Sequence, residues 1–357
     1  MNSKKLKKFW KNKKVLIIGH TGFTGSWLTI VLNYLGAFVS GYSLQNEKKH
    51  IIFNNLKLKK IIKHNCFADV NNISALSNFI KLTKPEIVIN LAAQPLVRKS
   101  YFNPIETYKT NLMGAVNILH VCKDIKSIKA ILMVTTDKVY LNTNKRKGYK
   151  ETDELGGVDP YSSSKAASEI AIYSLQKSFF KKKTSAYIAT ARAGNIIGGG
   201  DWSEDRLIPD LVKAHFNKNR FFVRSPNSIR PWQHILDAVY GYLTLSQKLF
   251  EKKKYSKGAW NFGPNSKNFL KVKDLIKKIN LISNLNLDWK IKRSSFYEAK
   301  TLKLNNSKSK IILKWRPVLT MNEMISLTFD WYSNINKNKS KLYDLTISQI
   351  KYFINKI

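Results

Sequence analysis

The stretch VLIIGHTGFTGSWLTIVLNYLG, residues 15–36, decides the fold. The short apolar run Val15–Ile18 is typical of a buried strand, and Gly19, Gly22 and Gly25 follow it directly. The next residues place apolar side chains at helical spacing until Gly36, which predicts a helix. Glycines at this turn let the backbone approach a pyrophosphate, and the helix N-terminus faces its negative charge. The loop predicts a dinucleotide site, although by itself it also fits an ordinary strand–helix turn.

Strand-like and helix-like segments alternate on either side of this unit. We expect further strands in 37–44, 86–93, 130–140 and 185–194, and helices in 73–82, 105–123 and 160–180. Continuous apolar strands that alternate with helices are typical of an α/β protein with a doubly wound parallel sheet. We therefore predict a nucleotide-binding Rossmann domain at 12–192 and a smaller C-terminal substrate-binding region at 193–357. Within the latter, a segment near 230–262 is expected to return to the main sheet.

The charge and the cysteine content limit the classes of protein to which the chain can belong. The formal net charge of +39 invites a nucleic-acid hypothesis, but the basic excess is Lys spread along the whole chain, and no base-stacking signature accompanies it. We expect no nucleic-acid partner, with a basic binder on an inactive scaffold as the alternative. Cys66 and Cys122 have no metal-site or CxxC spacing, which predicts no metal and a reducing, cytoplasmic location. No apolar run reaches membrane-spanning length, and VLII is too short for a signal peptide.

Two polar clusters carry the predicted chemistry. The apolar strand AILMV runs into a polar exit that contains Thr136, Asp137 and Lys138, and ligands bind at such carboxyl ends in doubly wound folds. Tyr161 and Lys165 lie one helical turn apart in DPYSSSKAASE. An ammonium beside a phenol lowers the phenol's pKa, so the phenolate can take a proton while a nicotinamide accepts hydride.

Such Tyr–Lys pairs also arise by chance in a lysine-rich chain. Tyr173/Lys177 and Tyr352/Lys356 have the same spacing but no comparable surroundings, and we interpret Tyr173 as a helix-packing residue.

The combination of motifs resembles a known family. GHTGFTG, NLAAQ, TTDKVY and YSSSK together resemble the nucleotide-sugar branch of the extended short-chain dehydrogenase/reductase family. RAGNIIGGGDW, DRLIPD, RPWQHI, NFGP and WRP narrow the resemblance to the CDP-glucose 4,6-dehydratases, across residues 9–332. The resemblance implies an NAD-dependent hydro-lyase that supplies a deoxysugar step of surface-polysaccharide (O-antigen) synthesis and forms a homodimer or higher oligomer. Another nucleotide-sugar dehydratase or epimerase is the alternative.

The resemblance also implies roles for the catalytic residues. Tyr161 would accept the proton of the sugar 4-hydroxyl, Thr136 would bond the 4-oxygen, and Asp137 would protonate the departing 6-hydroxyl. Lys138 stands at the position of the base for the C5 proton, where dTDP-glucose dehydratases carry a Glu. Hydride returns to C6, so the cofactor ends as it began.

Binding residues follow from the same resemblance. For NAD they are Gly19, Thr21, Gly22, Phe23, Thr24, Gly25, Asp69, Val70, Leu91, Ala92, Ala93, Tyr161 and Lys165. For CDP-glucose they are Gln94, Asn195, Gly199, Gly200, Arg206, Arg230, Trp232 and His234. Asp69 fits an adenine contact or a loop carboxylate equally, and Arg206 also fits a surface ion pair. Two departures stand out: Glu47 is the nearest carboxylate after the second strand, and Tyr297 occupies an expected His position.

Overall fold

A seven-stranded parallel sheet forms the centre of the computed structural model, which describes residues 3–45, 51–265, 268–283, 285, 287–292, 296–337 and 341–357. The strand order is β11-β6-β5-β4-β1-β2-β3, and all six pairings are parallel. The strands are β1 (Lys14–Ile18), β2 (Phe38–Ser43), β3 (His64–Phe67), β4 (Ile87–Asn90), β5 (Ala130–Val134), β6 (Tyr187–Ala193) and β11 (Gly258–Phe262). The predicted α/β class and doubly wound sheet are confirmed.

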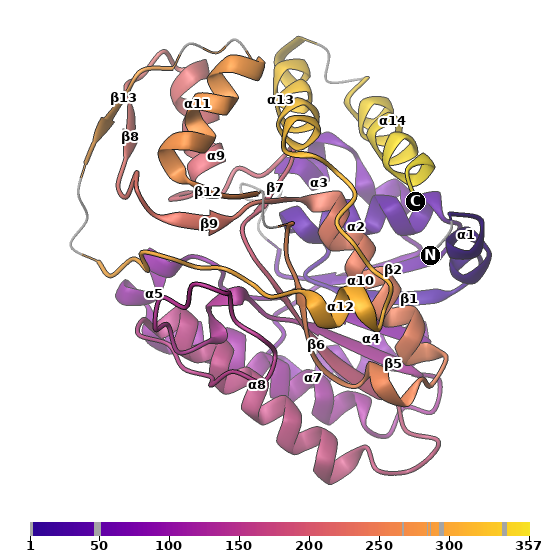
Figure 1. The fold of residues 1–357 in the computed structure, drawn as a ribbon. Coiled ribbons are helices and arrows are strands. Elements are labelled where there is room, and N and C mark those ends of the chain that lie inside the picture. The colour runs from indigo at the N-terminus through magenta and orange to yellow at the C-terminus, as the bar shows by residue number, and fades with distance from the viewer. Residues whose placement is uncertain are drawn as a thin grey trace.

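Helices cover both faces of this sheet (Figure 1). Successive strand side chains point to opposite faces, so Val15 and Ile17 join one apolar cluster while Leu16 and Ile18 join the other. The first cluster includes side chains of α2 (Phe23–Tyr34) and α10 (Ile235–Phe250). The second includes side chains of α4 (Ile73–Thr83), α7 (Gly114–Cys122) and α8 (Pro160–Phe179). Burial on both faces explains why these strands are continuously apolar in the sequence.

The predicted helix over 105–123 is a nearly continuous helical stretch made of three pieces. It runs through α6 (Pro104–Tyr108), a π-helical turn at Lys109–Met113, and α7. Further helices are α1 (Ser3–Trp10), α3 (Ile51–Asn55), α5 (Val97–Phe102) and α12 (Ser307–Ile311), and short 3₁₀ turns lie at Leu58–Ile61, Asp137–Val139 and Lys254–Ser256. Among the described helices, none is both long and apolar enough to cross a bilayer.

The C-terminal region lies over the carboxyl ends of the strands (Figure 1). It contains α9 (Leu207–Phe216), α11 (Val272–Ser283), α13 (Met321–Lys337) and α14 (Leu342–Asn355). Three small two-stranded sheets join β7 (Ile196–Ile197) to β10 (Gln233–His234), β9 (Ile229–Pro231) to β12 (Phe269–Lys271), and β8 (Phe221–Val223) to β13 (Trp289–Ile291). Between them the chain returns to the main sheet, because β11 pairs with β6 from Gly258↔Ala189 to Phe262↔Ala193.

A buried charged pair ties β6 to α8 beneath the carboxyl end of β5. Arg192 donates from Nε and Nη2 to the two carboxylate oxygens of Glu169, each at 3.0 Å, and both side chains are 4% exposed. Glu169 also accepts from the hydroxyls of Thr135 and Thr190 at 2.6 and 2.7 Å. Every carboxylate oxygen therefore has partners, as a buried charge requires.

Candidate active site

One large cavity opens at the carboxyl ends of the central strands. Its volume is about 940 Å³, and both the Rossmann half and the C-terminal region line it. The neighbouring strands β1 and β4 lie at the point where the strand order reverses. Ligands of doubly wound folds bind in the crevice at this position.

The glycine loop forms the floor of one end of the cavity. Gly19 has φ +89°, and a Cβ there would lie 2.7 Å from the backbone nitrogen of Ala92. A Cβ on Gly25 would lie 2.1 Å from the carbonyl oxygen of Gly19. Only glycine fits at these two positions, because the loop packs directly on itself and on the end of β4. Gly22 begins α2 without a side-chain cap, so backbone N–H groups of the first turn face the cavity for an anionic ligand.

The exit of β5 supplies a buried acid and an adjacent lysine. Thr136 donates from Oγ1 to Oδ1 of Asp137 at 3.1 Å, and Oδ2 of Asp137 is buried without a partner among the described residues. Burial raises the pKa of Asp137, against the opposing effects of Lys138, Thr136 and Arg230. Burial, with the positive charge of Arg230, lowers the pKa of Lys138. The two shifts favour a protonated carboxyl beside a neutral amine, which are the forms of a general acid and a general base.

Tyr161 and Lys165 enter the cavity from the first turns of α8. Asp159 caps this helix by accepting from the Ser162 backbone N–H at 2.9 Å, and Pro160 occupies its first turn. Burial raises the pKa of Tyr161 to about 12, although a hydrogen bond with Thr136 opposes this. Burial lowers the pKa of Lys165 to about 8.

The prediction that Lys165 lowers the phenol's pKa is wrong for the protein alone. The ammonium of Lys165 donates to the carbonyl oxygen of Val134 at 3.2 Å, and burial dominates the pKa of Tyr161. A phenolate therefore requires further positive charge or hydrogen bonds from bound ligands.

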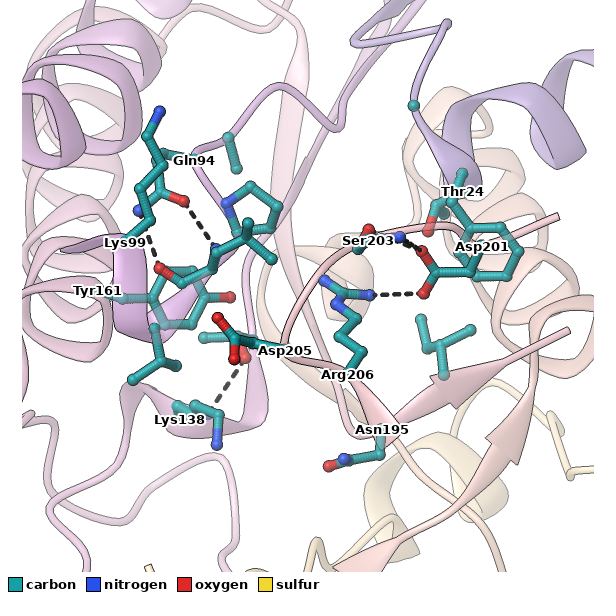
Figure 2. A pocket seen from close by; sticks show the side chains of 18 of the residues that line it. Thr24, Gln94, Lys99, Lys138, Tyr161, Asn195, Asp201, Ser203, Asp205 and Arg206 are labelled. Carbon is teal, nitrogen blue, oxygen red and sulfur yellow. Dashed lines mark hydrogen bonds and ion pairs between the residues drawn. The ribbon is translucent and has the colours of Figure 1, made fainter. Parts of the chain in front are cut away.

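Figure 2 shows how these side chains face the rest of the cavity. Tyr161 and Lys138 lie on one side of the view, while Asn195 and Arg206 extend from the opposite side. Arg206 donates to Asp201 at 3.2 Å, and Asp201 also accepts from the backbone and hydroxyl of Ser203. The candidate catalytic groups and the candidate anion-binding groups thus line one cavity.

Comparison with known proteins identifies the family. A sequence profile described as GDP-mannose 4,6 dehydratase matches residues 16–328, most of the chain. The chain belongs to this dehydratase family. A CDP-glucose 4,6-dehydratase of Salmonella typhimurium is 40% identical over 332 residues, covering 91% of this chain and 92% of that protein.

Solved structures show the same fold as this member of the dehydratase family. An epimerase of Methanothermobacter thermautotrophicus superposes with a TM-score of 0.81 at 18% identity, covering 95% of this chain and 97% of that one. A UDP-glucuronic acid 4-epimerase of Bacillus cereus, solved with UDP-glucuronic acid and NAD, gives 0.78 at 22% identity, covering 90% and 99%.

The cavity of this dehydratase-family member brings together most of the predicted site residues. All of the catalytic and cofactor-binding residues named above line it, as do Gln94, Asn195, Gly200, Arg206, Arg230 and Trp232. Asp69 also accepts from the backbone and side chain of Asn71 at 2.7 and 2.9 Å, so it stabilises its own loop as well as facing the cavity. Glu47 lies outside the described residues.

The structure does not bring Gly199 and His234 to the cavity. The carbonyl oxygen of Gly199 accepts from the indole of Trp27 at 2.9 Å, and a Cβ there would lie 2.0 Å from the ring of Trp331. His234 is fully buried, and its Nδ1 accepts from the Leu236 backbone at the start of α10. Burial lowers the pKa of His234 to about 3, so its imidazole stays neutral. Gly199 and His234 therefore pack behind the residues that line the cavity.

The two other Tyr–Lys pairs, Tyr173/Lys177 and Tyr352/Lys356, do not line the cavity. Tyr173 is 62% exposed, which corrects its interpretation as a helix-packing residue within the chain, and Lys177 lies over its ring. Tyr352 donates to Glu323 on α13.

Several charged residues of the cavity were missed in the sequence. Arg98, Asp205, Arg224 and Glu298 line it together with Tyr297. Arg98 and Asp205 carried a signal, since Arg98 lies in NLAAQPLVRKSY, which extends the NLAAQ motif, and Asp205 begins the DRLIPD motif. The others lie in segments whose proximity depends on the tertiary fold.

Proposed function

We propose that the protein is an NAD-dependent hydro-lyase that converts CDP-glucose to CDP-4-keto-6-deoxyglucose. The observation that carries the proposal is the pair of buried Asp137 and half-buried Lys138, whose pKa values are shifted in opposite directions and which line the cavity with Tyr161 and Thr136. A dehydration needs an acid for the leaving hydroxyl and a base for the neighbouring carbon, and this pair supplies both. The 40% identical relative supports CDP-glucose as the substrate.

The glycine-loop end of the cavity fits a dinucleotide. Its backbone can approach a pyrophosphate because Gly19 and Gly25 carry no side chain, and the uncapped start of α2 offers N–H donors. Leu91 to Ala93 and Asp69 line the adjoining wall. NAD, when bound, supplies reversible hydride uptake. Lys165 also lines the cavity and would hold a ribose hydroxyl of the bound cofactor.

Side chains of the protein carry out the proton transfers of the reaction. Tyr161 takes the proton of the 4-hydroxyl, held by Thr136, as C4 loses hydride and becomes a ketone. The ketone acidifies the C5 hydrogen, which Lys138 removes, while Asp137 protonates the 6-hydroxyl and water departs. Lys138 would then return a proton to C5, and the return of hydride to C6 would be the chemistry that bound NAD supplies. The proton gained by Tyr161 balances the one lost by Asp137, so the net change is loss of one water.

Substrate binding is assigned to the opposite side of the cavity. Arg206 and Asn195 extend into it in Figure 2, and we assign them with Arg230 to the diphosphate and its surroundings. A planar guanidinium with several donors suits phosphate oxygens.

We further propose that the protein is a homodimer that acts in the cytoplasm. Large apolar side chains are exposed on one group of helices: Phe102, Ile105, Ile170, Tyr173 and Phe179, each at least 53% exposed. Exposed apolar side chains on the neighbouring helices α5, α6 and α8 favour an interaction surface there. Both cysteines are free, as a reducing compartment requires.

Mass spectrometry of the product tests the function directly. With CDP-glucose and NAD, we expect a product lighter by one water and no net NADH. UDP-glucose and dTDP-glucose in parallel reactions measure the nucleotide preference, and Tyr161→Phe is the inactive control. Stoichiometric NADH without dehydration, or a C4 epimer of unchanged mass, would contradict the proposal. Salt-dependent RNA binding without turnover would instead favour the nucleic-acid alternative.

A further inference from the structure

Two arginines from distant parts of the chain converge on one carboxylate oxygen at the cavity wall. Nη1 of Arg98 lies 2.6 Å and Nη1 of Arg224 lies 2.8 Å from Oδ1 of Asp205. Arg98 belongs to α5 in the Rossmann half, whereas Arg224 follows β8 and Asp205 precedes α9. All three residues line the cavity, and their side chains are between 27% and 40% exposed.

The hydrogen-bonding capacity of this pair is only partly used. Nε of Arg98 is buried and has no acceptor among the described residues, while its guanidinium lies over the ring of Phe296 at 5.4 Å. Arg224 is also fixed by a second carboxylate, because its Nε donates to Glu298 at 2.9 Å. One carboxylate oxygen thus serves two guanidiniums, and one buried donor is left over. A diphosphate would offer both more charge and more oxygens.

Asp205 itself is held in an unfavourable backbone conformation. Its φ is +60°, in the left-handed region that costs a non-glycine residue free energy. The side chain of the next residue, Arg206, extends into the same cavity (Figure 2). Nη2 of Arg224 also donates to the backbone carbonyl of Asp205 at 2.9 Å, so Arg224 bonds both the side chain and the backbone of this residue.

We propose that Asp205 occupies the position of the substrate's diphosphate in the free protein and is exchanged for it on binding. Arg98 and Arg224 are then diphosphate-binding residues, and Asp205 is an internal competitor. The inference rests on the proposed function in one respect, that the substrate is a nucleoside diphosphate sugar. The competitor sets a threshold: a ligand must carry more negative charge than a single carboxylate to displace it, which favours diphosphates over monoanions.

Binding measurements on Asp205→Asn test the exchange. Because two partly exposed ion pairs are removed from the free state, affinity for CDP and for inorganic pyrophosphate should rise about 3–10-fold by calorimetry. Affinity for cytidine, which has no phosphate, should not change. The matched control is Glu251→Gln, which breaks the 2.9 Å ion pair between Lys248 and Glu251. This pair does not line the cavity, so the substitution should alter none of the three affinities.

A second variant covers the possibility that Asp205→Asn does not fold. Arg98→Gln should weaken CDP and pyrophosphate binding about 3–10-fold and, combined with Asp205→Asn, should abolish the gain. Unchanged or weaker pyrophosphate binding in folded Asp205→Asn, or unchanged binding in Arg98→Gln, would overturn the proposal. Because pyrophosphate binding needs no turnover, failure of the wild type to dehydrate CDP-glucose would count against the proposed function alone.

Discussion

Replacing Arg192 with methionine would test the charged pair buried beneath the carboxyl end of β5. The guanidinium makes two 3.0 Å bonds to Glu169 and further bonds to the Tyr140 hydroxyl at 2.9 Å and the Glu151 carbonyl at 3.2 Å. Methionine keeps much of the volume of the side chain but removes every donor. Glu169 would then keep a buried negative charge whose remaining partners are two threonine hydroxyls and the charge of nearby Lys165.

The expected loss of stability follows from this burial. Removing one partner of a buried ion pair costs about 3–5 kcal/mol, because the other charge is left uncompensated. Native proteins have free energies of unfolding of about 5–15 kcal/mol, so Arg192→Met should remove a large part of the stability. The matched control is Lys145→Met. It breaks the ion pair between Lys145 and Asp153, whose side chains are 40% and 21% exposed. The loss of this exposed pair should lower stability by about 0.2–1 kcal/mol.

Urea unfolding followed by tryptophan fluorescence would measure both variants. The double variant Glu169→Gln/Arg192→Met removes the stranded charge as well, so it should lose less stability than the sum of the two single variants. A loss below about 1 kcal/mol in Arg192→Met, or simple additivity in the cycle, would refute the view that these charges are coupled.

Three further predictions concern the catalytic groups and a buried acid. Tyr161→Phe should lower turnover of CDP-glucose about 10²–10⁴-fold, because the proton acceptor is lost; Tyr173→Phe should keep it, and equal losses in the two folded variants would refute the assignment. Asp137→Asn should still form bound NADH in a single turnover but release little dehydrated product, whereas Lys138→Met should lose solvent deuterium exchange at C5; undiminished exchange would mean that another base acts. Burial raises the pKa of Asp237 from 3.8 to about 7, so the folded state keeps a proton that the unfolded chain loses and stability falls as pH rises through this window. The stability of Asp237→Asn should therefore improve relative to wild type between about pH 4 and 7, and a constant difference in urea midpoints across that range would contradict the assignment.

The central fold was predictable because its strands are buried on both faces. VLII, IVIN and AILMV are apolar runs that contrast sharply with their polar neighbours, and they became β1, β4 and β5. The strand β3, HNCF, was not predicted, since it is half-buried and its polar residues resemble a loop. A strand at the edge of a sheet needs less apolar surface, so its sequence signal is weaker.

The site was predictable where motif and position coincide, and not where it depends on distant segments. Thr136, Asp137 and Tyr161 follow strand ends or begin a helix, so topology alone places them together. Arg98 meets Asp205 and Arg224 only because the C-terminal region folds over the sheet, which no local pattern encodes. The pKa of Tyr161 could not be deduced from its spacing to Lys165, because burial outweighs a neighbour whose ammonium bonds Val134 instead.

The return of β11 to the main sheet has a consequence for modular engineering of this protein. A cut at the boundary between the two regions near residue 193 would remove β11 and leave Ala189–Ala193 of β6 without its neighbour. An uncovered row of backbone N–H and C=O groups is a template for pairing with other chains, so the isolated N-terminal half should aggregate. Substrate specificity should therefore be transplanted between relatives by grafting loops at the cavity, and not by exchanging halves.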